Sequence, residues 1–193
     1  MDSLHRFSSI PKGEINDLYS ELNTELKDVG VSESLYVHGG AVMCDLGCRD
    51  STMDIDAYYK NTELINSITR KLAKKYNKSY DIINDDIRPF LSNKGSYRLY
   101  KEFSNLKVYY ANDDYLFALK CCSCRTDSND MKDLIFLVKK LGINTIEQAD
   151  RIISKYFDLR EVSILYKDVL EDIWSGVAEL IYWGDSNVKG FCF

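Results

Sequence analysis

The sequence predicts an α+β protein in which a small mixed β-sheet with flanking helices is followed by a helical C-terminal half. Two observations predict this class. Strand-like alternation and helical spacing of apolar residues are interspersed over the first part of the chain, whereas helical spacing dominates after about residue 112. With 193 residues and no Pro-rich or Gly/Ser-rich linker, the chain is long enough for one well-filled core. We therefore expect a core with an N-terminal helix over 1–112 and a helical region over 113–193 that packs on it.

In the first part, helices and strands are expected to alternate. Leu18, Leu22 and Leu26 recur at helical spacing within 13–30, and Gly30 is a plausible stop. The amphipathic segment 61–77 has Asn61 or Thr62 as its cap and Leu64, Ile65, Ile68 and Leu72 on its inner side. The other expected elements are a strand over 34–40, a short helix over 41–47, a strand over 51–60, and short strands with a loop-helix piece within 79–91, 96–105 and 106–112.

In the second part, every expected element is a helix. Asp113 or Asp114 caps a helix that continues to 125, and a further helix over 129–142 ends in two lysines and Gly142. The run "TIEQ" at 145–148 fits a capping box, and it opens a helical segment expected to continue to about Trp174.

Composition and charge exclude several classes of protein. The net charge of −5 argues against a protein that coats nucleic acid non-specifically, although residues 66–125 hold 12 Lys or Arg and 6 Asp or Glu. No apolar run approaches the ~20 residues that span a bilayer, and the N-terminus lacks the apolar core of a signal peptide. We expect a cytoplasmic protein without a membrane partner. The six cysteines, which include "CCSC" at 121–124, are expected to be buried thiols rather than zinc ligands.

The run "GGAVMCDLGCRDSTMDID" at 39–56 carries the chemistry. In a strand, Asp54 and Asp56 project to the same side, with Cα atoms ~6.6 Å apart. Two such carboxylates can share hard divalent cations, which also bind substrate phosphates. Gly39 and Gly40 let the backbone approach a ligand closely, and the hydroxyls of Ser51 and Thr52 can add contacts to a phosphate or a ribose.

This run resembles the hallmark of the nucleotidyltransferase superfamily, whose catalytic fold is DNA polymerase β-like. That hallmark is a Gly-Gly or Gly-Ser pair followed by an acid–hydrophobe–acid triplet, and here 13 residues separate Gly40 from Asp54. The chain is most similar to the bacterial branch of abortive-infection-type toxin nucleotidyltransferases and their uncharacterised relatives, in which Gly47, Arg49 and Thr52 also match. The likeness covers about residues 30–157.

The resemblance implies roles for residues outside this run. Lys120 would point at the triphosphate, and Arg49 and Arg125 would bind the nucleotide. Asp130 and Asp133 would complete the site or anchor Arg125. A surface salt-bridge cluster is the alternative for Lys120, Arg125, Asp130 and Asp133. The third metal-ligating carboxylate of the superfamily has four candidates: Asp85, Asp86, Asp113 and Asp130. Asp86 and Asp130 are the two that we select.

The implied activity is transfer of an NMP unit from an NTP to the 3′ end of a tRNA or to a protein hydroxyl. Two Mg²⁺ ions, or Mn²⁺, would be held by Asp54 and Asp56, and a toxin would imply a partner antitoxin. The alternative is a catalytically inactive module of the same fold that binds a nucleotide or a protein partner. For His38 and the tyrosines at 58, 59, 97, 100, 109 and 110, packing within the sheet is favoured over contact with a nucleotide.

Overall fold

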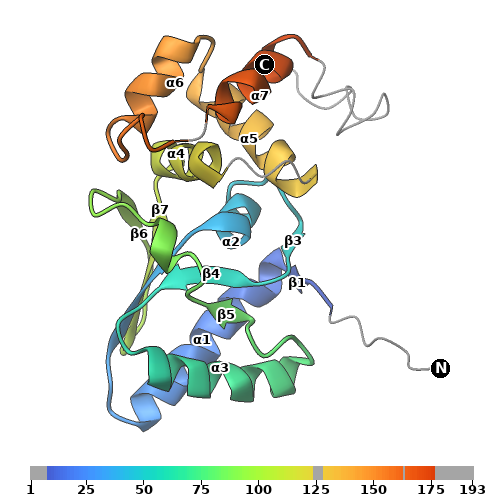
Figure 1. Ribbon diagram of the computed structural model, residues 1–193. Helices are drawn as coiled ribbons and strands as arrows, with labels where there is room; N and C mark the ends of the chain where they lie inside the picture. Colours follow the sequence, from blue (N-terminus) through green and yellow to red (C-terminus); the bar gives the residue numbers. More distant parts are fainter. Residues whose placement is uncertain (1–7, 124–127, 163, 177–193) are drawn as a thin grey trace, which may run out of the picture. The chain divides into compact units, whose positions relative to one another are not determined.

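The computed structural model describes residues 8–123, 128–162 and 164–176 (Figure 1). It is a mixed α+β structure with a mixed β-sheet, which confirms the class that the sequence predicts. The chain divides into two compact units. The first contains the residues up to Leu91 together with Ser96–Ala111, and the second contains Ser92–Gly95 and the residues from Asn112 onward.

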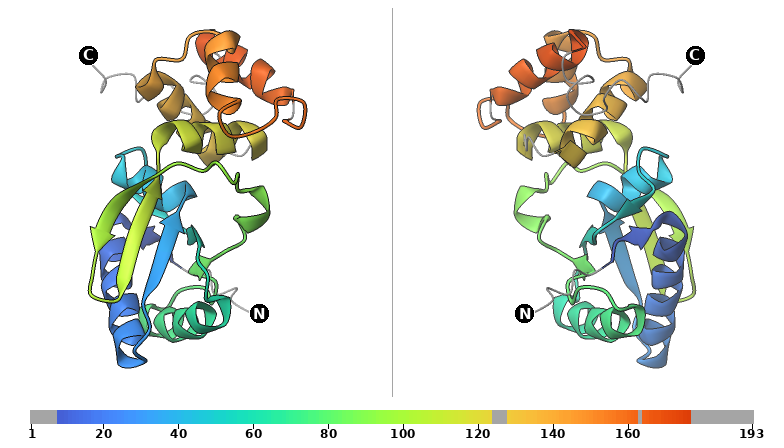
Figure 2. Two further views of the ribbon diagram at one scale, coloured as in Figure 1. Left: turned by 90° about the vertical axis from the view of Figure 1, so that its left-hand side faces the viewer. Right: turned by 90° about the vertical axis from the view of Figure 1, so that its right-hand side faces the viewer.

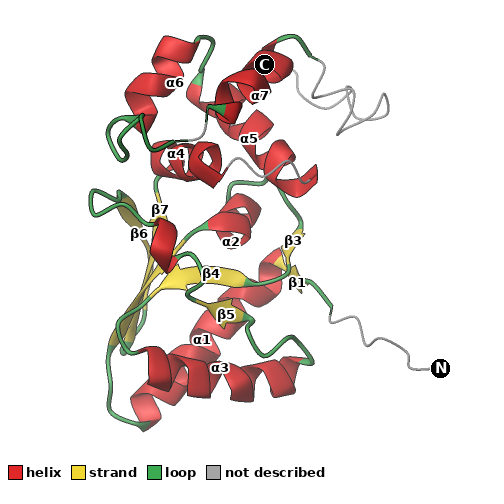
Figure 3. Cartoon of the chain, viewed as in Figure 1, coloured by secondary structure: helices red, strands yellow, loops and turns green. Residues whose placement is uncertain are grey.

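The first unit is built on a five-stranded sheet in the order β5-β4-β2-β7-β6 (Figure 3). Its strands are β2 (Glu33–Val37), β4 (Ile55–Tyr58), β5 (Ile83–Asn84), β6 (Tyr97–Glu102) and β7 (Leu106–Ala111). The central strand β2 runs antiparallel to β4 and parallel to β7, while β5 runs parallel to β4 and β6 antiparallel to β7. Beside this sheet, β1 (Ile10–Pro11) pairs with β3 (Ser51–Thr52).

Two amphipathic helices cover one face of the sheet. Helix α1 (Lys12–Asp28) packs against β7 and against α3 (Thr62–Tyr76), which in turn contacts β5; Figure 2 shows α1 lying along the strands. The three predicted leucines of α1 are fully buried, and the chain leaves the helix through Gly30 at φ +69°. In α3, Asn61 accepts the predicted capping bond from the Leu64 N–H, and the inner residues are buried except for Leu64, which is half-buried.

The expected strand over 51–60 is wrong as a single element. β3 pairs with β1 through Ile10 and Thr52, whereas β4 pairs with β2 and β5. The chain changes partners at Met53 and Asp54, which belong to neither strand. Asp54 therefore lies immediately before β4, and Asp56 lies within it.

In the second unit, all regular elements among the described residues are helices: α4 (Asp113–Ser123), α5 (Ser128–Leu141), α6 (Ile146–Ile153) and α7 (Leu165–Trp174). Thr145 accepts the predicted capping bond from the Gln148 N–H. The continuous helix expected from 145 to Trp174 is wrong, because turns separate α6 from α7. There, the Asp158 carboxylate accepts the backbone N–H of Arg160 at 3.0 Å, a local bond that competes with helical pairing.

A buried ion pair ties α1 to the segment that follows α3. The Lys78 ammonium lies 3.0 Å from the Glu14 carboxylate, donates to the Ser9 carbonyl at 2.6 Å and is 5% exposed. A more exposed pair, Lys71 with Glu25 at 2.8 Å, links α3 itself to α1. We expect Lys78→Met to lower the free energy of unfolding by about 3–5 kcal/mol, because it leaves Glu14 uncompensated, and Lys71→Met to change it by about 0–1 kcal/mol. Urea denaturation measures both, and equal losses would contradict a special role for Lys78.

Candidate active site at the glycine turn

The glycine pair brings backbone directly against the second aspartate. β2 ends at Val37, the His38 N–H donates to the Asp56 carbonyl at 2.9 Å, and helix α2 (Gly39–Asp45) follows. Gly39 has φ +58°, and a Cβ placed on it would lie 2.7 Å from Asp56 Oδ2. A Cβ on Gly40 would lie 2.1 Å from Thr52 Oγ1 and 3.4 Å from Arg49 Nη1. Only residues without side chains allow these contacts.

Both aspartates lie on the side of the sheet opposite to α1 and α3. Ile55 and Ala57 of β4 are fully buried, whereas Asp54, Asp56 and Tyr58 are half-buried and alternate with them. Successive side chains of a strand point to opposite faces, so Asp56 and Tyr58 share the outer face. Asp54 lies one residue before the strand on the same alternation.

Asp54 is in an electrostatically unfavourable position for a carboxylate. Burial raises the pKa of Asp54 above its ordinary value of 3.8, the charges of Asp81 and Asp86 raise it further, and Asn84 and Arg49 oppose them. The Asn84 side-chain amide reaches Asp54 Oδ2 at 3.5 Å. Acidic side chains held together against their own repulsion are a frequent feature of functional sites.

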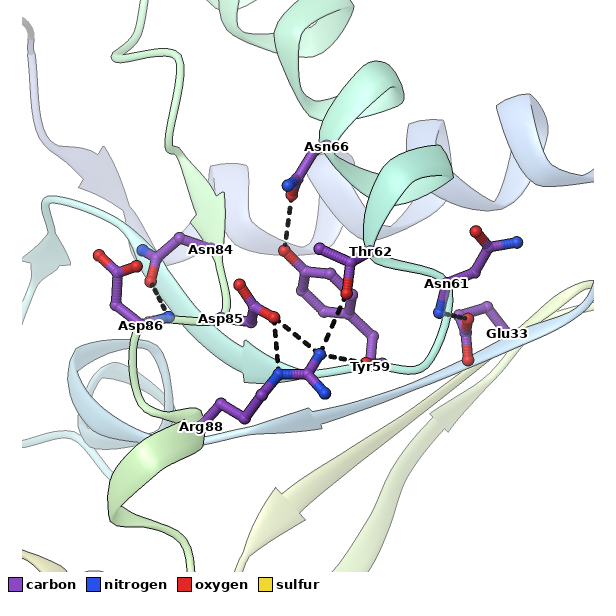
Figure 4. A network of polar contacts seen from close by, with 9 residues as sticks. All are labelled: Glu33, Tyr59, Asn61, Thr62, Asn66, Asn84, Asp85, Asp86 and Arg88. Atoms are coloured by element: carbon purple, nitrogen blue, oxygen red, sulfur yellow. Dashed lines mark hydrogen bonds and ion pairs between the residues drawn. The ribbon is translucent and has the colours of Figure 1, made fainter.

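Asp81 and Asn84 are site residues that the sequence analysis missed. Asn84 is nearly buried and pairs in register with Asp56; its amide donates to the Asp81 carbonyl at 3.2 Å, and its oxygen accepts the Asp86 N–H at 3.1 Å. Figure 4 shows the Asn84–Asp86 contact. Asp81 exerts the larger charge effect on the pKa of Asp54, ahead of the predicted Asp86. The pairing of β5 with β4 is what brings Asn84 beside Asp56. The spacing of residues along the sequence does not reveal that pairing.

Arg88 fixes the chain that follows these acids. Its guanidinium donates to Asp85 at 2.8 Å, to the Tyr59 carbonyl at 2.8 Å and to the Thr62 hydroxyl at 3.1 Å (Figure 4). Asp85, a candidate third carboxylate, is thus an ion-pair partner of Arg88. The segment 85–88 is anchored to the end of β4 and the start of α3.

Five of the predicted residues belong to the second unit. Lys120 forms ion pairs with Asp130 and with Asp133, the latter at 2.8 Å; Lys120 is 13% exposed and Asp133 is fully buried. Asp113 lies 3.7 Å from Lys140. The ion pairs of Lys120 with Asp130 and Asp133 are of the kind expected for a salt-bridge cluster, which the sequence analysis kept as the alternative to a catalytic role. Arg125 lies outside the described residues.

Other candidate groups are structural. His38 is 1% exposed, its Nε2 lies 3.0 Å from the Tyr97 hydroxyl, and burial lowers its pKa to about 4. It is the packed histidine that the sequence favours. Among the described cysteines, Cys44 and Cys121 are buried, and Cys48 and Cys122 are half-buried.

No group of three or more His, Cys, Asp or Glu side chains that could hold a metal ion as they stand occurs within the described ranges. In the same part of the chain, no helix is long and apolar enough to cross a membrane. No protein-family model, no curated protein and no solved structure matches the chain.

One prediction from this site concerns the close contact at Gly40. We expect Gly40→Ala to lower the free energy of unfolding by about 1–3 kcal/mol, because the buried Thr52 side chain has to shift. Gly13→Ala, in α1 with open space around its Cβ, is the control and is expected to gain about 0.5–1 kcal/mol. Urea midpoints decide, and an unchanged midpoint for Gly40→Ala would contradict the described contact.

The second prediction concerns the pH dependence of stability at Asp54. A carboxyl whose pKa is raised on folding contributes stability below its unfolded pKa and loses it as pH rises through the folded pKa. We therefore expect Asp54→Asn to stabilise the metal-free protein more at pH 7 than at pH 4. Asp50→Asn, at an exposed position, is the control. Thermal unfolding in EDTA at both pH values measures the difference, and a gain that is equal at both would contradict the raised pKa.

Proposed function

We propose that the chain is a metal-dependent nucleotidyltransferase that moves an NMP unit from an NTP to an acceptor hydroxyl and releases pyrophosphate. One observation carries the proposal: the Gly39–Gly40 turn lies against Asp56. In the same unit, Asp54 lies close enough to Asp81 for the charge of Asp81 to raise its pKa. On this proposal, the first unit has the nucleotidyltransferase fold and the helices from α4 onward form its accompanying half.

The donor set at this edge fits Mg²⁺ or Mn²⁺. Asp54, Asp56 and Asp81 offer carboxylate oxygens, which hard cations prefer, and Mg²⁺ commonly takes only one or two protein carboxylates beside phosphate oxygens and water. Burial, together with the charges of Asp81 and Asp86, raises the pKa of Asp54, and a bound cation would favour its ionised form. When bound, the two ions would supply Lewis-acid stabilisation of charge on the phosphate and on the attacking oxygen. We propose Asp81, ahead of Asp86 and Asp130, as the third carboxylate.

The glycine turn and its neighbours would hold the triphosphate. Gly39 and Gly40 leave the backbone accessible, and the guanidinium of Arg49 lies beside Gly40 and acts on the charge of Asp54. An arginine there can donate two parallel hydrogen bonds to a phosphate. In β3, the buried Thr52 faces Gly40, and the alternation of the strand turns the half-buried Ser51 to the opposite face, so Thr52 is the hydroxyl at the glycine turn.

The assignment of Lys120 and Arg125 to the triphosphate rests on the motif resemblance alone. An ammonium has three N–H donors, of which Asp130 and Asp133 accept two. The two aspartates would then orient Lys120 rather than ligate metal.

The competing proposal is an inactive module of the same fold that binds a nucleotide or a protein partner. The observation in its favour is that, within the described ranges, no three metal-binding side chains are already grouped. The choice of tRNA or protein as acceptor, a toxin role and an antitoxin partner rest on the motif resemblance alone.

The activity test supplies each of four α-³²P NTPs with Mg²⁺ to total tRNA and to total cell protein. Label is expected on one acceptor, and Asp54→Asn or Asp56→Asn is expected to reduce transfer at least ~10³-fold, because each removes a charge that holds the ions. The control is Asp50→Asn, which should transfer normally. No label on either pool, with the NTP intact, would favour the binding module.

The effect of metal and nucleotide on the melting temperature, compared with EDTA, gives an independent prediction. Mn²⁺ with a non-hydrolysable NTP is expected to raise the melting temperature of the wild type by several degrees, as ligands that bind only the folded state do. Asp54→Asn is expected to abolish most of that shift while melting no lower in EDTA. A shift of wild-type size in Asp54→Asn would remove this residue from the proposed metal site.

A further inference from the structure

One amide, the side chain of Asn84, connects the segments that carry the acids of the candidate site. Asn84 is 9% exposed and lies in β5, in register with Asp56 of β4. Its amide nitrogen reaches Asp54 Oδ2 at 3.5 Å and donates to the Asp81 carbonyl at 3.2 Å, and its oxygen accepts the Asp86 N–H at 3.1 Å. One buried group thus contacts three acidic residues, one through its carboxylate and two through their backbone.

The strand pairing of β5 is too short to place these acids by itself. β5 consists of Ile83 and Asn84, so Asp81 and Asp86 lie outside the strand, on either side of it. An asparagine oxygen that accepts the N–H two residues later forms a local turn, which Figure 4 shows between Asn84 and Asp86. The bond from the amide nitrogen back to the Asp81 carbonyl holds the chain before the strand. The Asn84 side chain therefore fixes the backbone on both sides of β5.

An amide orients these acids without neutralising them. In the second unit, by contrast, the buried Asp133 has an ammonium partner, Lys120. An ammonium at the position of Asn84 would compensate the negative charge that attracts a metal ion. An aspartate there could not donate to Asp54 or to the Asp81 carbonyl, because an ionised carboxylate only accepts hydrogen bonds. An asparagine supplies the donors and leaves the charge of the acids in place.

We propose that Asn84 is the positioning residue of the candidate metal site, and that its amide fixes Asp54 relative to Asp81 and to the chain at Asp86, so that a divalent cation finds its carboxylate ligands already arranged. The inference rests on the proposed function, because it concerns the cation that Asp54, Asp56 and Asp81 would bind. Groups that orient metal ligands through hydrogen bonds commonly account for about 10–100-fold in metal affinity.

The test compares Asn84→Leu with Asn105→Leu. Asn105 is a half-buried asparagine between β6 and β7, and its amide donates to the Val31 carbonyl at 3.0 Å. Each substitution removes an amide that donates to a backbone carbonyl, and each leaves the net charge unchanged. A difference in metal affinity between the two variants therefore reports the position of the acids and not their number. Asn84→Ala and Asn105→Ala, which add no bulk, are measured alongside.

Mn²⁺ alone is titrated into the metal-free protein, and the free ion is measured from its electron paramagnetic resonance signal. The Asn84 variants are expected to bind Mn²⁺ about 10–100-fold more weakly than the wild type, and the Asn105 variants are expected to bind it like the wild type. All four are expected to melt at a lower temperature, because each leaves backbone groups without their partners. Circular dichroism confirms that they are folded. In the metal-free protein, hydrogen exchange at the Asp86 amide is expected to be faster in the Asn84 variants alone.

Mn²⁺ binding of wild-type strength in both Asn84 variants, an equal loss in the Asn105 variants, or unchanged exchange at the Asp86 amide would overturn the positioning role. Assays of nucleotide transfer separate this failure from that of the proposed function. If the Asn84 variants bind Mn²⁺ more weakly and the wild type transfers no nucleotide, Asn84 stands as the positioning residue of a metal site and the transferase activity falls. If the wild type transfers nucleotide and the Asn84 variants bind Mn²⁺ as it does, the transferase stands and the positioning role falls. A wild type that binds no Mn²⁺ would remove both.

Discussion

The structure around the candidate site depends on one steric constraint, the contact of bare backbone at Gly39 and Gly40 with Asp56 and Thr52. A Cβ at either glycine would approach these side chains to 2.7 or 2.1 Å, far inside van der Waals contact. The contact lets β2 pair with β4 up to the bond from His38 to the Asp56 carbonyl, and it lets α2 begin at once. Turn, strand pairing and carboxylate position are therefore a single arrangement. A side chain at this turn would displace all three together.

The acids at this edge are held at a cost in free energy. Burial and the charges of Asp81 and Asp86 oppose ionisation of Asp54, and one amide donor and one guanidinium only partly compensate. Elsewhere, buried charge is paired: Lys78 has Glu14 and the Ser9 carbonyl, and Asp133 has Lys120. A cation at this cluster, as proposed above, would relieve that cost.

Local patterns in the sequence predict the elements whose packing is itself local. The leucines of α1, the Asn61 cap and the Thr145 cap each follow from spacing within one segment, and the structure confirms them. The break at Met53 and Asp54 is different, because it arises from a change of strand partner between β1 and β5, which lie far apart in sequence. Asp81 and Asn84 were missed for the same reason: α3 separates β5 from β4 along the chain, and only their pairing brings Asn84 beside Asp56. The acid–hydrophobe–acid triplet was recognisable because its geometry is contained in three residues.

The alternation of side chains in β4 determines where Asp56 lies. In β4, burying Ile55 and Ala57 under the helices places Asp56 and Tyr58 on the outer face, and pairing with β2 and β7 extends that face through Tyr36 and Tyr109. A shift of β4 by one residue would bury the carboxylate and expose the core, so the register is set by burial of the aliphatic residues. The same hydrophobic constraint that folds the sheet thus determines on which face Asp56 lies.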